Sequence, residues 1–358
     1  RTGWQRKARK LGSAPFLEFL GCLAPGSAQC GSPRRCLRAL EVCLELFGDS
    51  AAHATRLAAA CKHASVRAQA ARWLGVHGKP AGLAPLLKDS SALVRRNAVE
   101  SAARFWGDPA AEPLIEAVFG LASTTDRRLR HAIIASLAHL DPEGLPKAKT
   151  AGEKIVRGWV LAKKTGRGKL PAESLALGLA VLANKDTGAE DQLDALRLLN
   201  AAFDRLEAGE DPRYATFDTQ WGRVDLSAHQ GATAQTLAAI AGLVSAGDRR
   251  IAIEARRLAG KLGSGSAGLA AGMAADTSDT SAAADDMFLL WCLARLKGQW
   301  PAQTVQKVAA IGLDLPAKIR SQGVGRDNKW NTYARAIWER LLQRHPELGD
   351  ALIGDPRF

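Results

Sequence analysis

The sequence predicts an all-α protein, a right-handed solenoid built from about eight or nine stacked helix pairs. Three observations lead to this prediction. A helical pattern can be read twice in succession at a fixed spacing, Ala and Leu dominate while aromatic residues make up only 6%, and long alternations of Val, Ile and Thr are absent. Ala and Leu favour helices, whereas a strand would show a period of two. With 358 residues the chain also exceeds the usual size of one compact core, a limit that does not apply to an elongated stack.

The repeat is clearest between residues 66 and 115. Residues 66–87 and 94–115 align at a spacing of 28, and both copies break at a glycine, Gly78 or Gly107. A third copy of the first helix, at 129–140, follows at a spacing of 35. A period of about 20–50 residues is typical of stacked arrays, in which no unit can bury its apolar face alone. The matched positions are Val66 with Val94, Arg67 with Arg95, Ala70 with Ala98, Pro85 with Pro113, and Leu87 with Ile115.

These patterns divide the chain into four regions. A basic, irregular segment at 1–33 precedes regular repeats at 34–150; degenerate helical repeats follow at 151–300, and a C-terminal helical cap region occupies 301–358. Residues 208–228 lack helical periodicity, so we expect a loop insertion there. Residues 263–286 are rich in Gly, Ser and Thr and are expected to hold a short helix at most. Apolar periodicity predicts further helices at 33–47, 51–62, 195–203, 248–262, 287–296, 302–313 and 329–345.

The net charge of +13 permits binding to nucleic acid, acidic lipid or acidic protein. We interpret the local basic clusters as solvated surface or linker, with nucleic-acid contact as the alternative, because no recognised nucleic-acid-reading motif accompanies them. No apolar run is long enough to span a membrane. The chain begins with an arginine and shows no signal-peptide pattern, so we expect it to be a segment of a longer protein. The clusters are Arg1, Arg6, Lys7, Arg9 and Lys10, and Lys163, Lys164, Arg167 and Lys169.

The six cysteines form no C-x-x-C pair, which argues against a zinc ribbon, a thioredoxin-type pair and a C-x-x-C-H haem attachment. Cys36 and Cys43 lie seven residues apart in a helical stretch, on one face, and are interpreted as small buried apolar residues. Cys22 and Cys30 could form a disulfide in an oxidising compartment.

No catalytic, cofactor-binding or metal-binding residue is predicted. The motifs G-x-S-x-G, H-E-x-x-H, P-loop and G-x-G-x-x-G are absent, and the glycine-rich run at 263–268 follows a helix and is interpreted as a turn. His131 and His139 lie two turns apart on one helix, but no i,i+4 partner or neighbouring ligand accompanies them.

Four residues are candidates for an interaction surface. Arg67, Arg95 and Arg130 recur at one repeat position, so a stack would align them as a ladder. The ladder either binds neighbouring acidic groups or helix C-terminal carbonyls between repeats, or presents a basic stripe to a polyanion. Trp221 lies in the expected insertion and is either an anchor for a partner or packed back onto the stack. Trp73, Trp106, Trp159, Trp291 and Trp338 are expected in the core.

The repeat pattern, V-R-x-x-A followed by L-G and P-L-L, resembles the short HEAT-like repeats of the phycobilisome-lyase type. The resemblance is clear over 64–145 and looser over 34–300. HEAT repeats occur in scaffolds, chromophore lyases and alkyl-base DNA glycosylases, so the resemblance implies an architecture and little chemistry.

Three segments, 125–143, 287–301 and 316–358, resemble the HEAT section of large multidomain haem-binding dehydrogenase-like proteins typical of planctomycetes and verrucomicrobia. The resemblance implies a β-propeller of sugar-dehydrogenase type before this section, a c-type cytochrome domain after it, and export to the periplasm. It implies no redox residue or cofactor in this chain, because the propeller and C-x-x-C-H are absent; haem c would belong to a flanking domain.

We therefore expect a non-catalytic HEAT-repeat scaffold and protein-interaction module, the middle part of a larger exported redox protein. The isolated chain is not expected to be an enzyme, although its parent protein would be an oxidoreductase. The expected partners are neighbouring domains or other protein chains. One alternative is a nucleic-acid-binding repeat protein of DNA-glycosylase type, which would need a basic groove with a converging Asp and aromatic residues. Another is a chromophore-lyase-like protein.

Overall fold

The computed structural model describes residues 32–47, 52–206, 226–263, 267–275, 277–278, 280–324 and 329–358, and these residues form helices and turns without a strand. The chain divides into two compact units, Arg1–Lys164 (unit 1) and Thr165–Phe358 (unit 2). The predicted boundary at residue 150 lies one helix before this division. The all-α architecture of stacked helices is that of an α-solenoid; its handedness and the number of pairs stay predictions.

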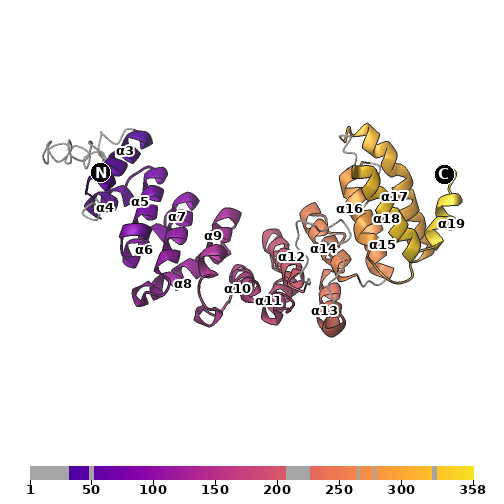
Figure 1. Cartoon of the computed structure of the whole chain (residues 1–358), viewed down its shortest axis with the longest axis horizontal. Helices are drawn as coiled ribbons and strands as arrows, with labels where there is room; N and C mark the ends of the chain where they lie inside the picture. Colours follow the sequence, from indigo (N-terminus) through magenta and orange to yellow (C-terminus); the bar gives the residue numbers. More distant parts are fainter. Residues whose placement is uncertain are drawn as a thin grey trace. The chain divides into compact units, whose positions relative to one another are not determined.

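Unit 1 is built from two layers of helices (Figure 1). Helices α5, α7 and α9 lie side by side in one layer, and α5 packs on α7 as α7 packs on α9. The short helices α6 and α8 form the second layer. The helices of unit 1 are α3 (Pro33–Phe47), α4 (Ala52–Ala59), α5 (Ala64–His77), α6 (Ala84–Leu87), α7 (Ala92–Ala102), α8 (Glu112–Gly120), α9 (Arg127–Leu137) and α10 (Ala151–Lys164). Short 3-10 turns join them: η2 (Pro80–Gly82), η3 (Ala103–Phe105), η4 (Pro109–Ala111), η5 (Leu121–Ser123) and η6 (Pro142–Gly144).

The equivalent apolar positions of the repeats form the core between these layers. Val66, Val94 and Leu129, which the sequence alignment pairs, are all fully buried. The helices approach closely where the side chains are small. A Cβ on Gly75 of α5 would lie 2.6 Å from the Cβ of Ser101 on α7, so glycine is what allows this contact. Unit 1 thus shows the burial between neighbours that the repeat period predicts.

Unit 2 is a stack of its own, with α12 against α14, α14 against α16, and α16 against α17. One apolar cluster runs from Leu175 to Leu348 through this unit. Helix α17 extends beyond the predicted end at residue 313 and passes through Pro316, because Leu315 just before the proline and Lys318 just after it are buried. The helices are α11 (Ala172–Ala183), α12 (Ala189–Asp204), α13 (Gln230–Ile240), α14 (Arg249–Leu262), α15 (Ala267–Ala275), α16 (Ala283–Leu293), α17 (Ala302–Ser321), α18 (Lys329–Arg344) and α19 (Glu347–Ile353), with the 3-10 turn η8 (Ser227–His229).

The expected insertion at 208–228 lies outside the described residues up to residue 225, and Trp221 with it. Cys22 and Cys30 also lie outside them. Cys36 is fully buried, as a small apolar side chain would be. None of the described helices is both long and apolar enough to cross a bilayer.

Candidate functional site

The three ladder arginines lie in the first turns of α5, α7 and α9. Each guanidinium reaches back to the segment before its own helix and donates hydrogen bonds to backbone carbonyl oxygens there. Arg67 Nη1 bonds Cys61 O (2.8 Å) and Lys62 O (3.0 Å), Arg95 Nη1 bonds Asp89 O (2.7 Å) and Ser90 O (3.0 Å), and Arg130 Nη2 bonds Thr124 O (2.7 Å). These hydrogen bonds satisfy backbone carbonyl groups between helices. They correspond to the first of the two roles considered for the ladder, in which the arginines bind groups between repeats.

Arg67 also joins one repeat to the next. Its Nε donates to Asp89 Oδ2 at 2.6 Å and its Nη2 to Asp89 Oδ1 at 2.8 Å. The same Oδ1 accepts the backbone N–H of Ser91, the residue before α7. The Arg67 guanidinium holds the pKa of the Asp89 carboxyl below its usual range, and Asp89 raises the pKa of Arg67. One carboxylate therefore fixes both α5 and the start of α7.

These contacts leave little of the ladder at the surface. Arg130 is 4% exposed, and Arg67 and Arg95 are half-buried. A role for these three arginines or for Trp221 in binding a partner stays a prediction.

A different set of residues, exposed apart from the half-buried Arg96, lies on the solvent side of the same layer. On α7 they occupy positions i, i+3, i+7 and i+11, which fall on one side of a helix. The residues on α5 and α9 occupy equivalent positions of their own repeats. We call this set the α5–α7–α9 stripe: Arg72 and Val76 on α5; Leu93, Arg96, Glu100 and the following Arg104 on α7; and Arg128, His131 and the following His139 on α9. Repeat comparison did not single it out, because its residue types change from one copy to the next.

The stripe is basic because α5 and α9 contain no acidic residue and α7 contains only Glu100. The Nε of half-buried Arg96 lies 3.6 Å from the carboxylate of exposed Glu100, and this pair neutralises one charge. Arg104 and Arg128 are exposed and have no acidic partner among the described residues. Arg128 in the first turn of α9 also faces the positive end of the helix dipole, where α8, α10 and α12 carry acidic residues.

The net charge of the whole chain resides in unit 1. Residues 1–164 contain 26 Lys and Arg against 13 Asp and Glu, a net charge of +13, whereas residues 165–358 contain 23 of each. The sequence analysis identified local basic clusters but not the difference in net charge between the two units. That difference becomes visible only when the boundary between the units is known.

Charges in unit 2 are largely paired within the fold. Arg250 Nη1 binds Glu190 at 2.6 Å and its Nη2 binds Asp248 at 2.8 Å, while Arg249 binds Asp285. These pairs connect the N-terminal ends of α12, α14 and α16. Exposed pairs of this kind contribute little stability each, but they leave no excess of positive charge at these ends.

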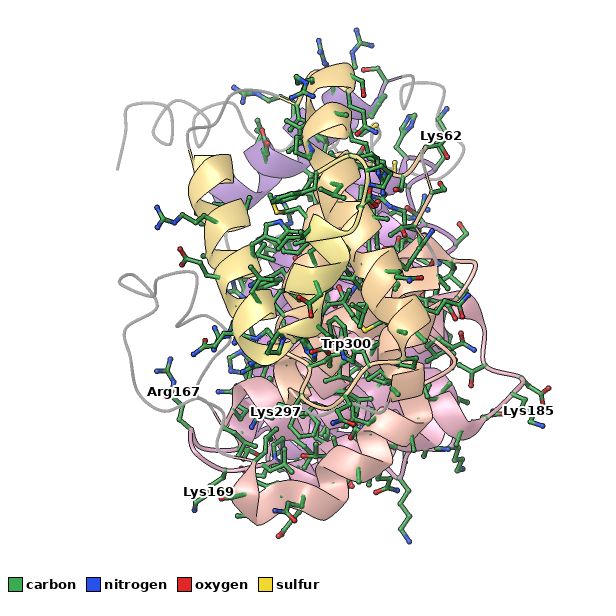
Figure 2. All side chains as sticks on the ribbon, turned by 90° about the vertical axis from the view of Figure 1, so that its right-hand side faces the viewer. Lys62, Arg167, Lys169, Lys185, Lys297 and Trp300 are labelled. Carbon is green, nitrogen blue, oxygen red and sulfur yellow. The ribbon has the colours of Figure 1, made fainter. Side chains whose placement is uncertain are left out.

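The basic cluster predicted at 163–169 lies at the end of α10 and in the loop that follows. Lys163 and Lys164 occupy the last turn of α10, where cations complement the helix dipole. In Figure 2 the side chains of Arg167 and Lys169 extend outward from the loop before α11, and Lys185 extends from the loop after it. The arrangement is that of solvated loop charges.

The tryptophans predicted in the core lie in packing contacts, whereas two of the histidines are exposed. Trp73 is 8% exposed, and the indole N–H of Trp106 donates to Ser136 O at 2.8 Å. Trp159, Trp291 and Trp338 are half-buried against their cores. His131 and His139 are exposed, and the described residues contain no group of His, Cys, Asp or Glu arranged to hold a metal.

His345 is a buried titratable group in unit 2. Its ring stacks on Trp300 with centroids 3.6 Å apart, and its Nε2 lies 3.3 Å from Leu296 O. Figure 2 shows Trp300 within the loop between α16 and α17. Burial lowers the pKa of His345, and this outweighs the opposite effect of Glu347, whose Oε1 lies 3.5 Å from Nδ1.

Comparison with known proteins supports the repeat architecture. Residues 51–138 match the family model of HEAT repeats. This stretch contains α4 to α9, with the ladder and all of the stripe except His139. The crystal structure of an engineered protein aligns with 99% of this chain and 92% of its own, at a TM-score of 0.45 and 14% identity. That likeness is too weak to carry an argument. No curated protein matches the sequence. Residues 51–138 are therefore similar to HEAT repeats, and the narrower resemblance to multidomain dehydrogenases stays a prediction.

Proposed function

We propose that this chain is a non-catalytic HEAT-repeat module that serves as a scaffold and docking surface for protein. The observation that carries the proposal is the layer formed by α5, α7 and α9, in which equivalent positions are either buried between repeats or exposed in a row. Stacked helices of this kind provide an extended and stiff surface. HEAT repeats are in general protein-interaction modules.

We further propose that the module forms the middle part of a larger exported protein, between a dehydrogenase propeller and a c-type cytochrome domain. This placement rests on the resemblance of the three segments at 125–143, 287–301 and 316–358. Haem c would be bound by the flanking domain, and the module would hold the two redox domains apart. The buried thiols of Cys36 and Cys292 are compatible with either an oxidising or a reducing compartment.

Sequencing the coding region on both sides of this segment tests the placement. A C-x-x-C-H motif within about 150 residues downstream, a typical domain length, together with a propeller upstream, would support it. An open reading frame that ends directly at both borders would contradict it.

Chemical cross-linking of the full-length protein followed by mass spectrometry tests the docking role. We expect cross-links between the exposed lysines of this segment and another domain or chain. A pattern confined to links within the segment itself would contradict a docking role.

A nucleic-acid-binding function is the second candidate, and the concentration of positive charge in unit 1 favours it. Such binding would weaken steeply with salt, because each neutralised phosphate releases counterions. A titration of duplex DNA at several salt concentrations distinguishes the two candidates: a steep linear loss of log affinity with log salt would support nucleic acid.

A further inference from the structure

We infer that the α5–α7–α9 stripe docks an acidic and aliphatic segment of a partner protein, in the form of an amphipathic helix laid across the three helices. This inference rests on the proposed docking function and names the surface and the chemistry of its partner. It starts from two independent features of the stripe, its charge and its exposed apolar side chains.

The charge of the stripe is positive and is not compensated within the described residues. Arg72, Arg96, Arg104 and Arg128 face one Glu100. Only Arg96 approaches that carboxylate, and the Arg72 Nε hydrogen-bonds the Asn97 side chain instead. Like charges kept on adjacent helices oppose folding, so a partner of opposite charge would recover that cost on binding.

The apolar side chains lie on the same stripe. In the described part of unit 1, the large apolar residues that are exposed are Val76, at 54%, and Leu93, at 42%. Val76 lies at the C-terminal end of α5 and Leu93 at the N-terminal end of α7. A protein interface typically combines arginine with apolar anchors, because arginine packs through its stem while its guanidinium binds carboxylates.

This combination favours a protein over a nucleic acid. The exposed carboxylate of Glu100, 51% exposed in the middle of the stripe, would repel phosphates. Val76 and Leu93 would gain nothing against a phosphate backbone, and the stripe offers no Trp, Tyr or Phe on which bases could stack. An amphipathic helix with Glu or Asp on one side and Leu, Ile or Val on the other satisfies both the arginines and the apolar residues.

The dimensions also suit such a helix. Stacked helices lie about 8–10 Å apart, so three of them present about 20–30 Å. Val76 lies at the C-terminal end of α5 and Arg128 at the N-terminal end of α9, so a helix of about 20 residues, about 30 Å long, would cross the three helices diagonally, with Leu93 and Arg104 on its two sides.

The test uses a display library of helical peptides of about 20 residues, acidic on one face and aliphatic on the other, selected against the full chain. Recovered peptides are synthesised, and their affinities are measured by fluorescence anisotropy. Variant Arg104→Glu/Arg128→Glu is compared with variant Lys79→Glu/Lys88→Glu, which changes charge equally at exposed positions flanking η2 and α6 of the same unit. Leu93→Ser tests the apolar anchor, and circular dichroism confirms that each variant is folded.

We expect the arginine variant to weaken peptide binding by about tenfold or more and Leu93→Ser by about fivefold, with the lysine variant changing it by less than about twofold. Equal losses in both charge variants, or no recovered peptide, would overturn the inference. So would duplex DNA that displaces the peptide and binds Leu93→Ser as tightly as the unaltered chain. If cross-linking of the full-length protein finds a partner elsewhere on the chain, the docking function stands and only this surface is wrong.

Discussion

Arg67 and Asp89 form a two-point contact that links consecutive repeats of unit 1. Nε and Nη2 of the arginine donate to Oδ2 and Oδ1 of the carboxylate at 2.6 and 2.8 Å. The arginine belongs to α5 and the aspartate precedes α7, so the pair fixes the relative position of two helices that share a core. The side chains are only 15% and 9% exposed, which limits screening by water and salt.

Replacing Asp89 by Asn should lower the stability of unit 1 by about 1–3 kcal/mol, because a partly buried guanidinium loses its charged acceptor. Urea unfolding monitored by hydrogen exchange in α5 and α7 measures this change. Glu100→Gln, which removes the charge of exposed Glu100 from its 3.6 Å pair with half-buried Arg96, serves as the control and should cost less than about 1 kcal/mol. Equal effects of the two substitutions would show that the contact has no special role.

The same pair predicts a dependence on pH. The pKa of Asp89 is lower in the folded chain than in the unfolded chain, so its contribution is present above about pH 4 and is lost as the pH falls through the folded pKa. The stability of unit 1 should therefore fall less steeply with acid in Asp89→Asn than in the unaltered chain. Identical slopes between pH 5 and pH 2, which lie about one unit above and two units below the usual aspartate pKa, would contradict this.

Gly152 of α10 should tolerate no side chain. A Cβ there would lie against the backbone carbonyl of Ala122, which cannot move without shifting η5. We expect Gly152→Ala to destabilise unit 1 by about 1–3 kcal/mol. Gly120→Ala is the matched control: Gly120 ends α8 with helical φ of −62°, has open space around it, and should gain up to about 1 kcal/mol. Thermal unfolding of both variants gives the comparison, and a stable Gly152→Ala protein would show that the contact of α10 with η5 is looser than described.

A buried ion pair should be critical for unit 2. Lys318 Nζ binds Asp286 Oδ2 at 2.6 Å and also donates to Ser278 O and Ser281 Oγ. Asp286 is 1% exposed, so removing either partner alone leaves an uncompensated buried charge. Asp286→Asn or Lys318→Met should each cost about 3–5 kcal/mol, and the double variant should cost clearly less than their sum.

Urea unfolding of unit 2, followed by hydrogen exchange in α16 and α17, completes this double-mutant cycle. The control is Glu339→Gln, which breaks the exposed i,i+4 pair with Arg335 on α18 and should be nearly neutral. Strict additivity in the Asp286 and Lys318 cycle would show that the two groups do not interact.

His345 should make unit 2 sensitive to mild acid. Burial against Trp300 lowers its folded pKa, so the unfolded chain takes up a proton first, and stability falls as the pH drops below about 6.5. His345→Gln, which keeps a donor near Leu296 O, should remove this part of the pH dependence between about pH 7 and pH 5. A slope unchanged by the substitution would assign the effect to another group.

The sequence predicted the helices well because their apolar positions are periodic. The prediction at 33–47 coincides with α3, and the helix predicted at 248–262 is α14. The end of α17 was missed because Pro316 normally ends a helix. Here Leu315 before the proline and Lys318 after it are both buried, and these tertiary contacts, which no local pattern reveals, hold the helix together across Pro316.

The candidate surface was less accessible from sequence for a physical reason. Comparing repeats finds residues that stay the same, and packing preserves Val66, Val94 and Leu129 in the core. The comparison of repeats also identified Arg67, Arg95 and Arg130, which bind backbone carbonyl groups between repeats. Exposed positions such as Arg72 and Leu93 have no such constraint and vary among copies. Their common face became visible only when α5, α7 and α9 were placed side by side.

The central claim is that unit 1 docks protein through the α5–α7–α9 stripe, and site-specific photo-cross-linking tests it most directly. A photoreactive amino acid is placed at Leu93, or at Lys88 as control, in the full-length protein in its native host. We predict covalent adducts with an acidic protein segment from position 93 and none above background from position 88. Adducts with nucleic acid, or equal protein adducts from both positions, would contradict the account.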